Sequence, residues 1–160
     1  MFRELLGLPA HALLVHAAVV FVPLLALVGT AYAILPRFRA RLDWAAAALA
    51  VTAPGSAFFA KESGEELREV LVAKNYPAEI IRQVDEHQEY GGLTFWWSVG
   101  LGLATVLLLV VTSRRPRARS LPAWLGMVLG GVVVVLAVVN VIYVYLTGDS
   151  GAEAVWQGVL

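Results

Sequence analysis

Three histidines are the residues of this chain with the widest range of chemistry: His11, His16 and His87. The 160-residue sequence contains no cysteine, which excludes disulfides, iron-sulfur clusters, thiolate zinc sites and covalently attached c-type haem. Any metal or redox chemistry must therefore use imidazole, carboxylate or a cofactor bound without a covalent link.

A divalent metal is one ligand that these histidines could bind. The ion would take neutral imidazoles from His11, His16 or His87 and a carboxylate such as Asp149. His11 and His16 are five residues apart, about 140° around a regular helix. They can chelate one ion as a pair only if the helix is irregular at its start near Pro9.

A b-type haem is the other ligand that fits. It needs one or two axial histidines from different helices, which His16 and His87 provide, and a flat apolar slot. Trp96 and Trp97 could wall that slot, so we expect them beside His16 and His87 at a cofactor-binding site. The alternative is structural, because tryptophan near a span end is a common interfacial anchor and a membrane histidine can simply hydrogen-bond a neighbouring helix.

The elements that position these residues are membrane-spanning helices. The chain is 59% hydrophobic with a mean hydropathy of +0.74, which is too apolar for a soluble domain. Four segments approach or exceed the length that crosses a bilayer, at about 10–35, 43–60, 93–112 and 121–147. Short loops join the first pair and the second pair, so we expect an all-α membrane protein with one domain over residues 1–160, an antiparallel four-helix bundle.

The insert 61–92 is the one substantial piece outside these spans. Thr52 to Ser56, which includes Pro54, should bend or end the second span before it. Pro77 favours a helix start, and Gly91-Gly92 should stop that helix. We therefore expect a short amphipathic helical hairpin on the external face between spans two and three.

Basic residues mark the orientation of the chain. Seven of the twelve lie in two short loops, 36–41 and 114–119, and with Asp43 the cytoplasmic segments carry seven bases and one acid, a net charge of +6. The remaining five bases and eleven acids give −6 elsewhere. Short basic loops stay on the cytoplasmic side, so both termini are expected outside. Lipid is the expected partner, and nucleic acid is not, because phosphates need a concentrated basic face.

A layer of polar residues is expected near the outer surface. No Asp, Glu, Lys or Arg lies in the interior of a span, which weighs against a small transporter. At 1.5 Å per residue, one polar residue of each span falls within roughly 6–10 Å of the outer surface. These four are His16, Ser56, Ser98 and Asn140.

Two glycines in the fourth span, Gly126 and Gly130, have the four-residue spacing that permits tight helix contact. They could serve packing within the chain or a homodimer.

The two ends of the chain resemble motifs of a known family. Leu8 to His16, with the sequence LPAHALLVH, resembles the opening motif of a bacterial integral membrane family, domain of unknown function 2231 (DUF2231). Thr147 to Trp156 is similar to its closing motif, Gly-His-Ser-Gly-Ala followed by Val-Trp, and His87 is also in place. The resemblance implies a four-span, multi-pass protein of the bacterial plasma (inner) membrane. Asp149 stands where many relatives carry His; a carboxylate is a poor haem ligand and a good ligand for a hard or borderline metal.

We therefore expect a histidine-lined polar site near the outer face that binds haem b or a divalent metal for redox chemistry. His16 and His87 would be the main ligands, with His11 and Asp149 supporting them. The rival hypothesis is a non-catalytic scaffold, or a subunit of a larger complex, whose histidines brace the helices.

Overall fold

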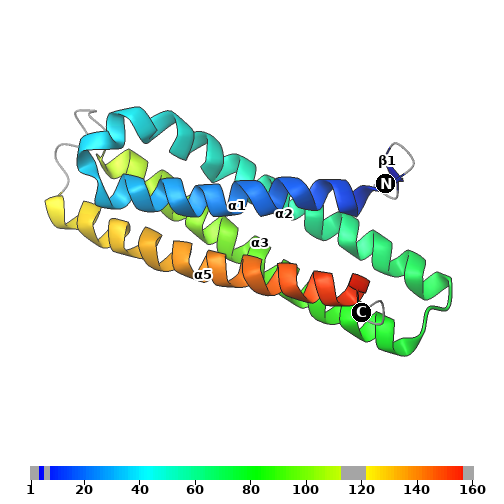
Figure 1. Ribbon diagram of the computed structural model, residues 1–160. Coiled ribbons are helices and arrows are strands. Elements are labelled where there is room, and N and C mark those ends of the chain that lie inside the picture. Colours follow the sequence, from blue (N-terminus) through cyan, green and yellow to red (C-terminus); the bar gives the residue numbers. More distant parts are fainter. Residues whose placement is uncertain (1–3, 6–7, 113–121, 157–160) are drawn as a thin grey trace.

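A computed structural model describes residues 4–5, 8–112 and 122–156. Its long helices run antiparallel in one bundle (Figure 1): α1 (Ala10–Ile34), α2 (Arg39–Ala73), α3 (Ala78–Thr112) and α5 (Ala123–Trp156). A short 3-10 helix, η1 (Pro36–Phe38), joins α1 to α2. Before α1, the two-residue strands β1 (Glu4–Leu5) and β2 (Leu8–Pro9) pair antiparallel.

The helices form a closed ring. Each packs on its neighbour in the sequence, and α1 completes the ring against α5, so α1 and α3 lie diagonally across it. We call the end where α1 begins and α5 finishes the terminal end (Figure 1). The opposite end, with η1, is called the loop end. The second basic loop, 114–119, lies outside the described residues.

The outer surface of the bundle is apolar. Each of the four long helices in the described part of the chain is long and apolar enough to cross a membrane. Large side chains face outward with most of their surface exposed, among them Leu27 (66%), Val51 (71%) and Met127 (72%). An apolar belt of this extent on all sides is stable in lipid and not in water. The fold is a multi-pass membrane bundle, as the sequence predicts.

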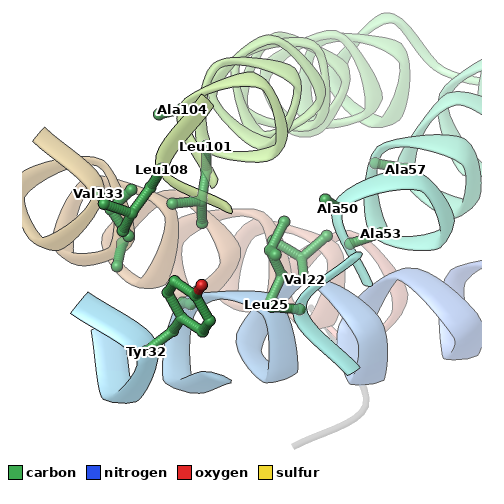
Figure 2. Packing of buried hydrophobic residues seen from close by; sticks show 13 residues of the cluster. Val22, Leu25, Tyr32, Ala50, Ala53, Ala57, Leu101, Ala104, Leu108 and Val133 are labelled. Carbon is green, nitrogen blue, oxygen red and sulfur yellow. The ribbon is translucent and has the colours of Figure 1, made fainter. Parts of the chain in front are cut away.

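The interior of the bundle combines small residues on α2 with larger ones on the other helices. Figure 2 shows Ala50, Ala53 and Ala57 of α2 in the same core as Leu25 of α1 and Leu101 of α3. Small side chains let helix backbones approach closely in lipid, where dispersion contacts and hydrogen bonds hold helices together.

α2 and α3 approach each other closely at Gly102. A Cβ atom on Gly102 would lie 2.6 Å from the carbonyl oxygen of Ala50 and 3.2 Å from Cγ of Pro54. The Pro54 ring therefore packs directly on α3, so the proline belongs to the helix contact. A neighbouring helix of this kind is what allows a proline inside a membrane span.

The insert 61–92 differs in detail from the expected surface hairpin. α2 continues through Pro54 to Ala73, and α3 runs through Gly91-Gly92 without a stop, so the insert consists of the outer parts of these two 35-residue helices. Their hairpin extends past the start of α1 and the end of α5 (Figure 1). It turns at Asn75, whose φ of 56° is left-handed. The helix continues although each glycine costs about 1 kcal/mol in helix propensity, and a Cβ on Gly91 would lie 3.9 Å from Cγ2 of Thr147 on α5.

Charged residues stabilise the outer part of this hairpin. Arg68 of α2 donates hydrogen bonds to both carboxylate oxygens of Asp85 on α3, the Nη2–Oδ2 distance being 3.2 Å. Lys61 pairs with Glu65 one turn along α2. Charges at this density need water, so this part of α2 and α3 lies outside the hydrocarbon.

Gly126 and Gly130 each lie against a residue of a neighbouring helix. A Cβ on Gly126 would lie 3.6 Å from Cγ2 of Thr112, and one on Gly130 would lie 3.6 Å from Cβ of Ala33. Both glycines therefore serve packing within the chain, and a homodimer through them stays a prediction.

Candidate two-histidine site

His11 and His87 meet at the terminal end of the bundle. Their ring centroids are 6.0 Å apart and their planes are inclined by 81°. His11 is the second residue of α1, and His87 lies in α3, diagonally opposite. The two imidazoles therefore approach each other across the interior of the helix ring.

His11 is held by α2 through one ring nitrogen. Its Nδ1 lies 3.0 Å from the carbonyl oxygen of Ala60 and 3.3 Å from Oγ of Ser63. A carbonyl oxygen can only accept, so Nδ1 carries the proton and donates it to Ala60. In the neutral ring, Nε2 then has the free lone pair and is the nitrogen available to a ligand.

His87 is held in a similar way by α5. Its Nδ1 lies 3.2 Å from Oγ of Ser150, and that hydroxyl donates its own hydrogen to the carbonyl oxygen of Thr147 at 3.2 Å. In the arrangement in which Ser150 donates to Thr147, its oxygen accepts from Nδ1 of His87. In that arrangement both histidines have a lone pair on Nε2.

Two glycines form the walls on which the rings lie. A Cβ on Gly64 of α2 would be 3.2 Å from Cε1 of His11, and one on Gly151 of α5 would be 2.9 Å from Cε1 of His87. Any larger residue at Gly151 would displace the ring. All four long helices thus contribute to this site, two with an imidazole and two with a serine and a glycine.

Burial sets the charge of the pair. Asp85, Glu86 and Glu89 surround His87 in sequence, so this turn of α3 lies beyond the apolar span. Burial lowers the pKa of His87 below its ordinary value and the nearby His11 lowers it further, against an opposing hydrogen bond to the Thr147 backbone. The neutral imidazole, the form that binds a metal, is favoured at pH 7.

The comparison with protein families agrees with the membrane architecture. A family model described as a predicted membrane protein, DUF2231, matches residues 7–160. The chain belongs to the DUF2231 family. Neither the curated proteins nor the solved structures gave a match to it. The residues matched by the DUF2231 model include both terminal motifs, and the description of the family names no chemistry for the site.

The other two predicted metal ligands of this DUF2231 chain lie elsewhere. His16 is exposed on α1, and its Nδ1 bonds the carbonyl oxygen of Ala12 in the same helix at 2.6 Å. Asp149 is exposed on α5. Across the described residues, no three His, Asp or Glu side chains are grouped closely enough to hold a metal ion. The structure brings His11 and His87 together and leaves His16 and Asp149 outside the pair.

The predicted aromatic wall also lies apart from the pair. Trp97 stacks on Tyr143 of α5, with centroids 6.3 Å apart, and Trp96 packs against Phe95 at 5.0 Å. Trp96 is 66% exposed, which suits an interfacial anchor. A haem-binding role for Trp96 and Trp97 stays a prediction.

Below the histidines, the inward-facing polar residues of DUF2231 helices α3 and α5 bond to each other. Thr94 and Thr147 join their hydroxyls at 2.9 Å, and the buried Asn140 donates to the carbonyl oxygens of Trp97 at 3.0 Å and Leu136 at 2.8 Å. Of the predicted polar layer, Ser98 and Asn140 are fully buried. Asn140 and the two threonines join α3 to α5, whereas Ser98 donates to the carbonyl oxygen of Phe95 in its own helix.

The residues that hold the two rings were absent from the expected site. Ser150 and Gly151 lie in the closing motif, GDSGA, next to the predicted ligand Asp149. Ser63 and Gly64 follow a lysine and a glutamate in a charged stretch, and no sequence motif distinguishes them.

Proposed function

We propose that this DUF2231 protein binds a transition-metal ion on the extracytoplasmic side of the bacterial inner membrane, through Nε2 of His11 and Nε2 of His87. The supporting observation is the meeting of two neutral imidazoles whose centroids lie 6.0 Å apart. Histidines that ligate metals usually donate their other ring N–H to a carbonyl or another acceptor, which fixes the tautomer. Here Ala60 and Ser150 are these acceptors.

The spacing of the rings suits one ion between them. Imidazole nitrogens bind zinc at about 2.0–2.1 Å, so two rings on one ion have centroids about 5–6.5 Å apart, depending on the angle at the ion. The observed separation of 6.0 Å falls in this range. Binding of an ion would require both Nε2 atoms to point at it while the Nδ1 atoms keep their bonds to Ala60 and Ser150.

Two imidazoles leave the remaining coordination positions open. Copper, iron, nickel and zinc all accept imidazole ligands, and copper and iron add redox chemistry. A site with open positions near one membrane face could pass electrons to an external partner. Haem b is the alternative cofactor, because two axial imidazoles on either side of its iron require a similar spacing.

Charge supports the proposed orientation. Arg37, Arg39 and Arg41 lie at the loop end, whereas the acids of the hairpin lie beyond the terminal end. Short basic segments stay in the cytoplasm, which puts the histidines on the outer side. A reporter enzyme fused after Leu160 should be active outside the cytoplasm, and cytoplasmic activity would contradict this orientation.

A structural role for the histidines is the competing function. His11 links α1 to α2 and His87 links α3 to α5, so the pair could brace the bundle of a non-catalytic scaffold. Removing either ring would then lower stability without affecting any ligand.

The test is metal content and absorption of the purified protein. The detergent-solubilised protein is incubated with Cu(II) or Zn(II), desalted and analysed by mass spectrometry of the elements. We expect one ion per chain, bound at least about tenfold more weakly by His11→Ala and His87→Ala. His16→Ala is the matched control and should bind as the wild type does.

Each outcome separates the alternatives. A Soret absorption band that the wild type shows and both His11→Ala and His87→Ala lose would mean that the ligand is haem and not a free metal ion. Colourless protein that binds neither metal, yet loses thermal stability in His11→Ala and His87→Ala, would establish bracing and refute the metal site. Loss of binding in His16→Ala alone would also refute it.

A further inference from the structure

A groove opens at the loop end of the bundle, on the opposite side of the membrane from the histidines. It has a volume of about 700 Å³ and lies between the end of α1, the end of α3 and the start of α5. Its walls are mainly apolar, with Ile34 and Met127 on either side and Gly130 and Gly131 along α5. Arg39 supplies its positive charge.

The guanidinium of Arg39 is fixed in place by the end of α1. Its Nε donates to the carbonyl oxygen of Tyr32 at 3.0 Å, and its Nη2 donates to that of Ala33 at 3.2 Å. It also lies over the Tyr32 ring, 5.4 Å from the centroid. These two bonds use two of the five N–H donors of an arginine, so others remain for an anion.

Two tryptophans place this charge at the level of the lipid headgroups. Trp44 on α2 is 75% exposed and Trp124 on α5 is 58% exposed, both within two turns of the loop-end start of their helix. Exposed tryptophans at span ends lie at the membrane–water interface. The guanidinium is therefore at headgroup depth, and the apolar walls along Ile34 and Val134 extend into the hydrocarbon.

We propose that this groove binds an anionic phospholipid of the adjacent leaflet, with its phosphate on Arg39 and an acyl chain along Gly130 and Gly131. Arg37 and Arg41 are in the same segment, and with Asp43 these residues give a net charge of +2, from three bases and one acid. Basic pockets between membrane helices on the cytoplasmic side bind anionic headgroups in this way. The proposal is independent of the metal site.

A second copy of the chain is a poorer occupant. A two-fold contact through this groove would bring Arg39 and its basic neighbours face to face with their own copies. Like charges at this distance repel, whereas a phosphate neutralises them.

The test uses native mass spectrometry of the full-length protein from detergent micelles containing equal amounts of phosphatidylglycerol and phosphatidylcholine. We expect the wild type to retain phosphatidylglycerol preferentially, by about fivefold. Arg39→Gln should abolish this preference, whereas Arg41→Gln, which removes the same charge from an exposed position, should leave most of it. Gly131→Leu should reduce retention of phosphatidylglycerol because its side chain fills the groove.

A matched variant controls for folding. Gly131 and Gly148 both have open space where a side chain would start, so the Cβ atom of either leucine meets no neighbouring atom. Gly148→Leu lies at the terminal end and should retain lipid as the wild type does. Equal retention of both lipids by the wild type, an equal loss in Arg41→Gln and Arg39→Gln, or a Gly131→Leu variant that keeps its lipid but loses a dimer would each overturn the proposal.

Discussion

Gly151 of α5 lies against the imidazole of His87 so closely that a methyl group in its place would stand 2.9 Å from Cε1 and 3.1 Å from Nδ1. Cβ atoms in proteins do not approach other heavy atoms to 2.9 Å, so the ring would have to move. The absence of a side chain at Gly151 therefore determines where His87 points.

The first prediction follows from this contact. Gly151→Ala should displace the His87 ring and weaken metal binding by about 10–100-fold, the usual effect of disturbing the residues around a ligand. Stability should change little, because the atoms that move belong to a side chain. Gly148→Ala, one turn earlier and open to the surroundings, is the control. Wild-type affinity in Gly151→Ala, measured by competition with a metal indicator, would contradict the site.

The second prediction concerns the contact between α2 and α3. Gly102→Ala should lower the free energy of unfolding by about 1–3 kcal/mol, because its methyl group would meet the backbone oxygen of Ala50 at 2.6 Å. Gly100→Ala is the matched control, since its nearest neighbour, Cδ2 of Leu136, is 4.0 Å away. Thermal unfolding in detergent compares the two. Equal melting temperatures would show that the helices are farther apart than described.

The third prediction concerns the buried Asn140. Asn140→Ala should cost about 0.6–1.7 kcal/mol, the range for hydrogen bonds between membrane helices, because its amide joins α5 to the Trp97 carbonyl of α3. Thr52→Ala removes a hydroxyl that bonds Ala48 within its own helix on an exposed face, and should change stability by less than about 0.5 kcal/mol. Reversible unfolding in mixed micelles measures both, and a larger loss in Thr52→Ala would refute this ranking.

The fourth prediction concerns the ion pair that joins the two arms of the hairpin. Arg68 and Asp85 are both well exposed, so a double-mutant cycle with alanine should give a small coupling energy that falls further in high salt. Lys61 and Glu65, which pair within α2, supply a comparison cycle. A coupling energy unaffected by salt would mean that the Arg68 pair is shielded from water.

The four spans could be predicted because their length and apolar character follow directly from bilayer thickness. The end of the second helix and the start of the third could not be predicted, because the helix-breaking signals at Pro54 and Gly91-Gly92 are local. Pro54 packs against Gly102 of α3 and Gly91 faces Thr147 of α5, and packing of this kind compensates for weak helix propensity.

The pairing of His11 with His87 was only partly accessible from the sequence. All three histidines were expected near one face, but His16 was expected as a main ligand, and the structure exposes it. A signal for the choice does exist. Steps of seven residues from the buried Tyr32 and Leu25 lead back to His11, and the same steps from the buried Leu101 lead through Thr94 to His87. A seven-residue spacing keeps side chains on one face of a packed helix, and His16 falls outside it.

The unbroken course of α2 and α3 links the site mechanically to the tip of the hairpin. Gly64 lies in α2 and His87 lies in α3, and each helix continues without a break from that residue to the turn at Asn75. A protein that binds this turn would therefore tilt the two helices together. The imidazole of His87 and the Gly64 backbone behind His11 would move with them. Contact more than ten residues away along either helix could thus open or close the space between the rings.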